Sequence, residues 1–155
     1  MIAVRVGTVR RVVVAAPGYL MRRPVIDTPF DLVSHPIIAV PHFGLESWNF
    51  GPAVGASGLR SVQLRPRMIV DSMRAAVASA IEGNGVTRVF SYAAAEPLRK
   101  GRLKRLLISD EDAPIPVHLV MPDGRLSVPK VRAFVDLAVP RLRAHFTSID
   151  LDAYS

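Results

Sequence analysis

Short runs of apolar residues recur along the chain, and turn-forming residues close most of them. Residues 11–16 are mostly β-branched or alanine and stop at Pro17-Gly18, and residues 37–40 stop at Pro41. This pattern is typical of buried strands. Before them, apolar and polar positions alternate from Val4 to Val9, which predicts a strand that leads into the buried segment. Further strands are predicted at residues 47–50, 61–64, 67–70, 86–90, 103–108 and 117–121.

Two helix starts carry capping residues. Thr28-Pro29-Phe30-Asp31 places a hydroxyl before a proline at the first helical position and an acid at the third. A short helix is therefore expected through Val33 and is stopped by Pro36. The clearest helix spans residues 73–82, between a cap at Asp71 or Ser72 and the stop signal Gly83-Asn84-Gly85. Its apolar face consists of Met73, Ala76, Val77, Ala80 and Ile81.

The C-terminal part of the chain predicts two more helices. One lies around residues 93–100, and the last begins at Pro129. Pro140 is expected to kink or end the final turn of this last helix, because proline has no N–H to donate. The apolar stripe of the helix is made of Val131, Phe134, Val135, Ala138 and Leu142.

The order of these elements indicates an α/β fold. Strand 67–70, helix 73–82 and strand 86–90 together have the length of a βαβ crossover, so the two strands are expected to be parallel neighbours. Strands and helices interleave throughout the chain. A mostly parallel mixed sheet flanked by helices is therefore predicted.

Composition narrows the class of protein. The chain has 155 residues, of which half are hydrophobic and 21% are charged, and it has no Cys. A disordered polymer, a disulfide scaffold and a thiolate zinc site are thereby excluded. The net charge is +7, but 17 of the 20 basic residues are Arg and they are spread along the chain. With only ten aromatic residues, a solvated basic surface is favoured over a nucleic-acid platform.

The sequence favours a cytoplasmic protein. Three Arg followed by an apolar run give the first 21 residues the outline of a signal peptide, although the strand alternation there favours a folded segment. The charge-free stretches 32–45 and 47–59 are shorter than the ~18 to 20 residues that a membrane span needs.

No catalytic, cofactor or metal site is predicted. The four histidines, His35, His42, His118 and His145, have no ligand cluster around them. Asp110-Glu111-Asp112 precedes Ala113-Pro114 and is interpreted as an exposed loop. Gly55-Ala56-Ser57-Gly58 precedes no convincing helix, so it is not a phosphate loop. An enzyme is not expected.

A ligand site is predicted at one edge of the sheet. The helix that begins after Asp71-Ser72 presents free N–H groups and a positive dipole end beyond the strand 67–70. Ligands of open α/β sheets bind at this edge. The turn Pro41-His42-Phe43-Gly44 follows another strand and reaches the same edge if the strands are parallel. The alternative is that Asp71 and Ser72 only cap their own helix.

The order of several fragments resembles the C-terminal part of the effector-binding domain of LysR-type transcriptional regulators. Each fragment is weak alone, but together they cover about residues 4–146. The fragments are the strand and turn 7–20 with Pro17-Gly18-Tyr19-Leu20, Thr28-Pro29-Phe30-Asp31-Leu32 with His35, Trp48-Asn49-Phe50, the helix from Val70-Asp71-Ser72 to Gly83-Asn84-Gly85-Val86, Gly101-Arg102-Leu103, Pro116-Val117-His118-Leu119-Val120, and residues 129–136.

The resemblance implies a type II periplasmic-binding-protein-like fold of two α/β subdomains with an effector cleft between them. Residues 1–121 would hold the second subdomain with the crossover strands, and residues 122–155 the terminal helix of an otherwise missing first subdomain. No helix-turn-helix can be placed before Val4, so DNA would be bound only through a region missing from this chain. The cleft residues carried over are Pro41, His42, Phe43, Asp71 and Ser72, and Asp71 leaves the charge of the effector open.

The favoured hypothesis is a truncated, non-catalytic effector-sensing domain of a LysR-type regulator. It would bind a small organic molecule and form a homo-oligomer through the apolar stripe of its last helix. Three alternatives stay open: a free-standing basic nucleic-acid-binding protein, an extracytoplasmic solute-binding fragment of the same fold, and an inert remnant of a larger gene.

Overall fold

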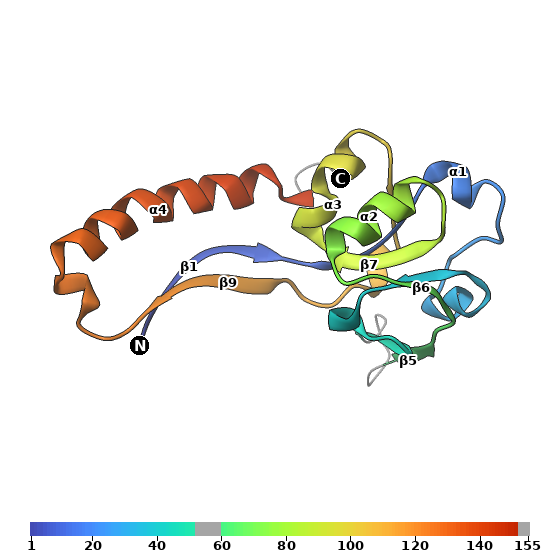
Figure 1. Cartoon of the computed structure of the whole chain (residues 1–155), viewed down its shortest axis with the longest axis horizontal. Helices are drawn as coiled ribbons and strands as arrows, with labels where there is room; N and C mark the ends of the chain where they lie inside the picture. Colours follow the sequence, from blue (N-terminus) through green and yellow to red (C-terminus); the bar gives the residue numbers. More distant parts are fainter. Residues whose placement is uncertain (52–59, 152–155) are drawn as a thin grey trace. The chain divides into compact units, whose positions relative to one another are not determined.

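The computed structural model describes residues 1–51 and 60–151, and the chain divides into two compact units. One unit consists of Met1–Val9 together with Pro114–Ser155, and the other of Arg10–Ala113. Figure 1 shows the elements of both units along the chain. The larger unit contains the predicted ligand site.

A five-stranded sheet forms the centre of the unit Arg10–Ala113. Its strands are β2 (Arg11–Ala15), β3 (Ile37–Ala39), β6 (Pro66–Ile69), β7 (Val86–Phe90) and β8 (Lys104–Leu106), in the order β6-β3-β7-β2-β8. β3 runs parallel to β6 and β7, whereas β2 runs antiparallel to β7 and β8. The predicted mixed α/β sheet is confirmed, with its parallel pairs confined to β6, β3 and β7.

One prediction about strand order is wrong. β6 and β7 have the same direction, as the crossover through α2 (Met73–Ile81) requires, but β3 lies between them. The length and direction of a crossover do not specify which strand fills the space between its two ends. The β6 strand is consequently an edge strand, and all four of its residues are exposed.

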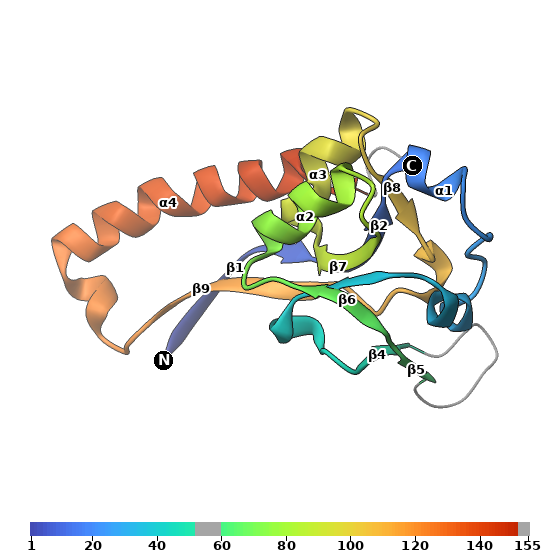
Figure 2. The ribbon, with the colours of Figure 1, turned by 45° about the vertical axis from the view of Figure 1, so that its right-hand side comes forward.

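Both faces of the sheet are covered. Helices α2 and α3 (Ser91–Arg99) lie on one face, and on the other lie the antiparallel pair β4 (Ser47–Phe50) and β5 (Arg60–Gln63) with the 3-10 helix η1 (Pro29–Ser34) (Figures 1 and 2). Consecutive residues of β2 are therefore buried on opposite sides, and Val12, Val13 and Val14 are all fully buried. This double burial explains the uninterrupted apolar run in the sequence.

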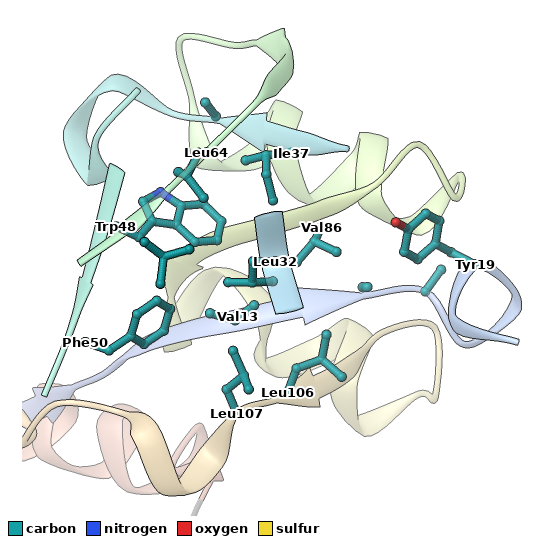
Figure 3. Close-up of a cluster of buried hydrophobic side chains, with 14 residues drawn as sticks. Val13, Tyr19, Leu32, Ile37, Trp48, Phe50, Leu64, Val86, Leu106 and Leu107 are labelled. Carbon is teal, nitrogen blue, oxygen red and sulfur yellow. The ribbon is translucent and has the colours of Figure 1, made fainter. Parts of the chain in front are cut away.

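The core on the β4–β5 side contains the largest buried side chains. Figure 3 shows Trp48 and Phe50 of β4 in one cluster with Leu32 of η1 and the sheet residues Val13 and Val86. Each of these five side chains is at most 2% exposed. The short strands predicted at residues 47–50 and 61–64 are thus confirmed, and together they form one wall of the core.

The predicted helix starts are confirmed at the level of their hydrogen bonds. The N–H groups of Asp27 and Thr28 donate to Oδ2 of Asp31, at 2.9 and 2.8 Å, and these two bonds hold the pKa of Asp31 below its ordinary value. At α2 the cap is Ser72, whose Oγ accepts from the N–H of Ala75 at 3.1 Å. Pro17-Gly18 begins a four-residue helix, α1 (Pro17–Leu20), where only a turn was expected.

The interpretation of Asp110-Glu111-Asp112 as an exposed loop is wrong. The Glu111 side chain is 4% exposed and receives a hydrogen bond of 2.7 Å from Nε of Arg105. Asp110 pairs with Arg60 at 2.8 Å, and Asp112 lies 3.4 and 3.6 Å from Arg11 and Arg88. Each acid is therefore neutralised within the fold.

Arg88 is the most buried arginine of this cluster. Its side chain is 4% exposed, its Nη1 donates to the carbonyl of Asn49 at 2.8 Å, and its guanidinium lies 4.7 Å from the ring centroid of Phe50. Burial lowers the pKa of Arg88 to about 10, although the charge of Asp112 opposes this shift. Arg88 therefore stays charged at neutral pH. Because it is buried and contacts Asn49 and Phe50, it is a structural residue and not part of a solvated surface.

The other unit is an antiparallel pair of strands with one long helix. β1 (Ile2–Val9) pairs antiparallel with β9 (Ile115–Met121), and α4 (Pro129–Ser148) packs on β1 (Figure 1). A 3-10 turn, η4 (Arg125–Ser127), precedes α4. The ring of Phe146 fills the space beside Gly7, where an added Cβ would clash with it.

Pro140 does not end α4, so this part of the expectation for the helix is wrong. The helix continues for eight residues past Pro140, to Ser148. Both Pro140 and Asp136, whose carbonyl loses its helical donor, are exposed, so water can solvate that carbonyl. Phe134, a member of the predicted apolar stripe, is 60% exposed, and Val139, which the stripe did not include, is buried. The residues of the predicted stripe that are half-buried are Val131, Val135, Ala138 and Leu142.

The Arg105–Glu111 pair gives a direct test of the buried cluster. Glu111→Gln removes the negative charge of a buried ion pair, so we expect the free energy of unfolding to fall by about 3 kcal/mol. Urea unfolding measures this change. The matched control is Glu96→Gln, which breaks an exposed pair with Lys100 and should have little effect. Equal effects of the two variants would contradict the structural role of Glu111.

Candidate functional site

The carboxyl ends of three parallel strands meet at one edge of the sheet. β3 continues into the 3-10 turn η2 (Pro41–Phe43), β6 continues into Asp71 and Ser72, and β7 ends at Phe90. The N–H of Val70 donates to the carbonyl of Ala39 at 3.0 Å and holds the first two ends together. The predicted convergence of the two segments is therefore present.

A cavity of about 390 Å³ lies at this edge. Four of the five predicted site residues line it: His42, Phe43, Asp71 and Ser72. Pro41 does not line the cavity but begins the turn that carries the two rings, and its carbonyl accepts from the N–H of Gly44 at 3.1 Å. The remaining lining residues are Val40, Met73 and Phe90.

Gly44 allows the turn to leave the site. Its φ is +101°, in the region that favours glycine, and a Cβ there would lie 2.5 Å from the carbonyl oxygen of Ser47. The chain can therefore turn sharply from η2 towards β4. A side chain at this position would displace the turn that presents His42 and Phe43.

Aromatic rings form one wall of the cavity. The ring centroids of His42 and Phe43 are 5.0 Å apart, and those of Phe43 and Phe90 are also 5.0 Å apart, both in edge-to-face geometry. Tyr92 stacks on the other side of Phe90 at 5.9 Å. Such a wall offers ring faces and edges to a planar apolar group.

The polar side of the cavity is the beginning of α2. Ser72 uses its Oγ and its carbonyl to accept from the N–H groups of Ala75 and Ala76. Ser72 thus caps its own helix, as the alternative interpretation held. Within the described residues, the N–H groups of Met73 and Arg74 have no hydrogen-bond acceptor, so two backbone donors remain for a ligand.

Asp71 is the only formally charged side chain that lines the cavity. It is exposed, and no arginine or lysine lines the same space. The cavity therefore combines one carboxylate, a histidine and two aromatic rings with free backbone donors. These groups suit a planar organic molecule that carries a hydrogen-bonding substituent.

Sequence reasoning missed Val40, Met73 and Phe90. Phe90 ends a strand that the sequence did predict, so the parallel direction of that strand was sufficient to place it at this edge. Met73 was assigned only to the apolar face of α2, yet its Sδ receives a hydrogen bond of 3.3 Å from the N–H of Phe90. No sequence pattern indicated this contact.

Other kinds of site find no support in the part of the chain that the structure describes. Over residues 1–51 and 60–151 there is no group of three or more His, Asp or Glu side chains that could hold a metal ion. Within the same residues, no helix is both long and apolar enough to cross a membrane. The glycines at positions 55 and 58 lie outside the described residues.

Comparisons with known proteins identify the family of the chain. The family model described as the LysR substrate binding domain matches residues 1–143. The HTH-type transcriptional regulator YhjC of Escherichia coli is 30% identical over 135 residues, which are 86% of this chain and 45% of YhjC. The regulator PtxR of Pseudomonas aeruginosa is 28% identical over 132 residues, 82% of this chain and 40% of PtxR.

Solved structures show the same fold. The regulatory domain of AphB from Vibrio vulnificus has a TM-score of 0.77 at 22% identity and covers 90% of this chain and 68% of that chain. The regulatory domain of CrgA from Neisseria meningitidis has a TM-score of 0.72 at 20% identity, with 91% and 69% covered. CrgA is described there as a LysR-type transcriptional regulator.

The chain belongs to the LysR substrate-binding domain family. It has the periplasmic-binding-protein-like α/β fold of that family and is an effector-binding domain of the LysR type. It spans less than half the length of the curated relatives named above. Those relatives are transcriptional regulators, and the matches favour neither a free-standing nucleic-acid-binding protein nor a solute-binding fragment.

Proposed function

We propose that this chain senses a small organic effector for a LysR-type transcriptional regulator and has no catalytic role. The observation that carries the proposal is the convergence of His42, Phe43, Asp71 and Ser72 on one cavity. These residues come from two segments about 30 positions apart, and they meet at the sheet edge where α/β folds bind ligands. DNA would be contacted through a helix-turn-helix region outside this chain, in the cytoplasm.

The two units correspond, in this proposal, to parts of two subdomains. The unit Arg10–Ala113 has its own sheet, its own core and the candidate cavity. We assign it to the second subdomain, and we assign α4 to the first. The strands β1 and β9, which flank the larger unit in sequence, would be the crossover strands.

The effector is expected to be aromatic and neutral or cationic. The wall of His42, Phe43 and Phe90 favours a planar ring, and Asp71 opposes an anion because no cation lines the cavity. Free N–H groups at the start of α2 can donate hydrogen bonds to a neutral oxygen substituent. A ring that carries a hydroxyl or an amine satisfies both sides of the cavity.

Three probes with the same ring and different charges test this proposal. Benzylamine and benzyl alcohol should bind more tightly than benzoate, as measured by the shift of the unfolding midpoint, because a ligand of the folded state raises it. Phe43→Ala should weaken the binding of benzylamine about tenfold by removing an edge-to-face partner and its apolar area. Asp71→Asn should make the affinity for benzoate similar to the affinity for benzylamine, because it removes the negative charge of the cavity.

The matched control is Phe30→Ala. Phe30 is also largely exposed in the same unit but does not line this cavity, so its removal should leave probe binding unchanged. If benzoate binds best, or if Phe30→Ala weakens binding as much as Phe43→Ala, the effector class proposed for this cavity is wrong.

We also propose that the domain self-associates through α4. Phe134 and Leu137 lie three residues apart on this helix and are 60% and 55% exposed, and exposed apolar groups of this size favour association. Sedimentation velocity should show a dimer or larger species that Phe134→Asp dissociates. A monomer at high concentration, or an oligomer that Phe134→Asp leaves intact, would contradict this use of α4.

A further inference from the structure

A second cavity lies in the unit Arg10–Ala113, at the other end of α2. Its volume is about 550 Å³, and it is lined by α1, by the two arginines that follow α1, by the C-terminal end of α2, and by Gly101 and Arg102, which follow α3. The candidate effector cavity lies at the N-terminal end of α2. The nine residues of this helix separate the two sites by about 13 Å.

Three arginines line this second cavity: Arg22, Arg23 and Arg102. In the part of the chain that the structure describes, Arg22 and Arg23 take part in no ion pair, and Arg23 lies 5.4 Å from the ring centroid of Tyr19. Arg102 has only a distant partner, Glu96, at 3.8 Å, and both side chains are exposed. The three positive charges are therefore available to a ligand.

Glycines leave the wall of the cavity open. Gly18, Gly83 and Gly101 line it, and a Cβ added to any of them would meet no atom within 4 Å. Their backbone therefore faces free space, not packed side chains. A ligand can approach the main chain here as well as the arginines.

The negative charges at this place do not cancel the positive ones. Glu82 is the only acid that lines the cavity, and the C-terminal ends of α2 and α3 add roughly half a negative charge each. When the three positive guanidinium groups, the one carboxylate and the partial charges of the two helix ends are added, the net charge is about +1. The net charge at this place is therefore positive, and a compact oxyanion that can accept hydrogen bonds from several guanidinium groups at once fits best.

We propose that this cavity binds a small multivalent oxyanion of the phosphate class. Guanidinium groups bind such anions through paired N–H donors, and these charge-assisted hydrogen bonds are about twice as strong as neutral ones. The site is separate from the candidate effector cavity, and the proposal does not depend on the identity of the effector.

The buried pair Tyr19 and His35 provides a reporter beside this cavity. The hydroxyl of Tyr19, which lines the cavity, is 2.7 Å from Nδ1 of His35. Burial lowers the pKa of His35, and the positive charge of Arg23 lowers it further. An oxyanion bound beside Arg23 would offset that charge, so the pKa of His35 should rise when the anion binds.

Inorganic phosphate is the probe for the test. Phosphate should raise the unfolding midpoint of the chain more than sodium chloride does at the same ionic strength, and it should raise the pKa of His35 followed by NMR. The double variant Arg22→Gln/Arg102→Gln should weaken phosphate binding at least tenfold, because it removes two charge-assisted contacts. Glu82→Gln should strengthen binding, because it removes the one repelling carboxylate.

Arg132→Gln is the matched control, since Arg132 is an exposed arginine of α4 that does not line the cavity. It should leave phosphate binding unchanged. The unfolding midpoint in chloride shows whether each variant folds. If the double variant does not fold, the phosphate affinity of Glu82→Gln and the titration of His35 in the unaltered chain test the proposal instead. The proposal would be overturned if phosphate raised the unfolding midpoint no more than chloride does. It would also be overturned if Arg132→Gln weakened phosphate binding as much as Arg22→Gln/Arg102→Gln does.

Discussion

Three consecutive carboxylates, those of Asp110, Glu111 and Asp112, meet guanidinium groups from four different strands. The arginines belong to β2, β5, β7 and β8. This one segment therefore links β5 to three strands of the central sheet. Moving a charged side chain from water into the protein interior costs several kcal/mol unless a partner compensates the charge. Arg88 therefore cannot remain 4% exposed without Asp112 and the carbonyl of Asn49.

The candidate effector site depends on this arrangement. Arg88 lies on β7, two residues before Phe90, and it fixes that strand against β4 through Asn49. With β7 held beside β3, the carboxyl ends of both strands present Phe90, His42 and Phe43 at one edge. The network of charges around Arg88 thus holds the strand whose end carries Phe90.

Local patterns predicted the elements well, and contacts between distant segments were predicted poorly. Thr28 and Ser72 begin helices because their capping bonds lie within four residues, which a sequence shows directly. The Asp110–Arg60 pair joins residues 50 positions apart, so the acidic run could not be distinguished from an exposed loop. The position of β3 between β6 and β7 is likewise a property of the assembled sheet.

The site shows the same division. His42, Phe43, Asp71 and Ser72 were predicted because strand ends and a helix start are visible in the sequence. The parallel direction of β7 was sufficient to place Phe90 there, but Met73 could not be predicted, because its contact with Phe90 joins a helix start to a strand end 17 residues later. For α4, the course of the helix past Pro140 depends on the solvation of one carbonyl, which residue type alone does not specify.

Methyl NMR of the methionines tests most directly whether the ligand site lies at the carboxyl edge of the sheet. Met73 lines the candidate cavity, whereas Met68 lies on β6 and Met121 at the end of β9, and neither lines it. Titration with benzylamine should shift the Met73 methyl signal through the ring current of the probe and leave those of Met68 and Met121 in place. A shift confined to the other methionines, or saturable binding with no change at Met73, would contradict the account.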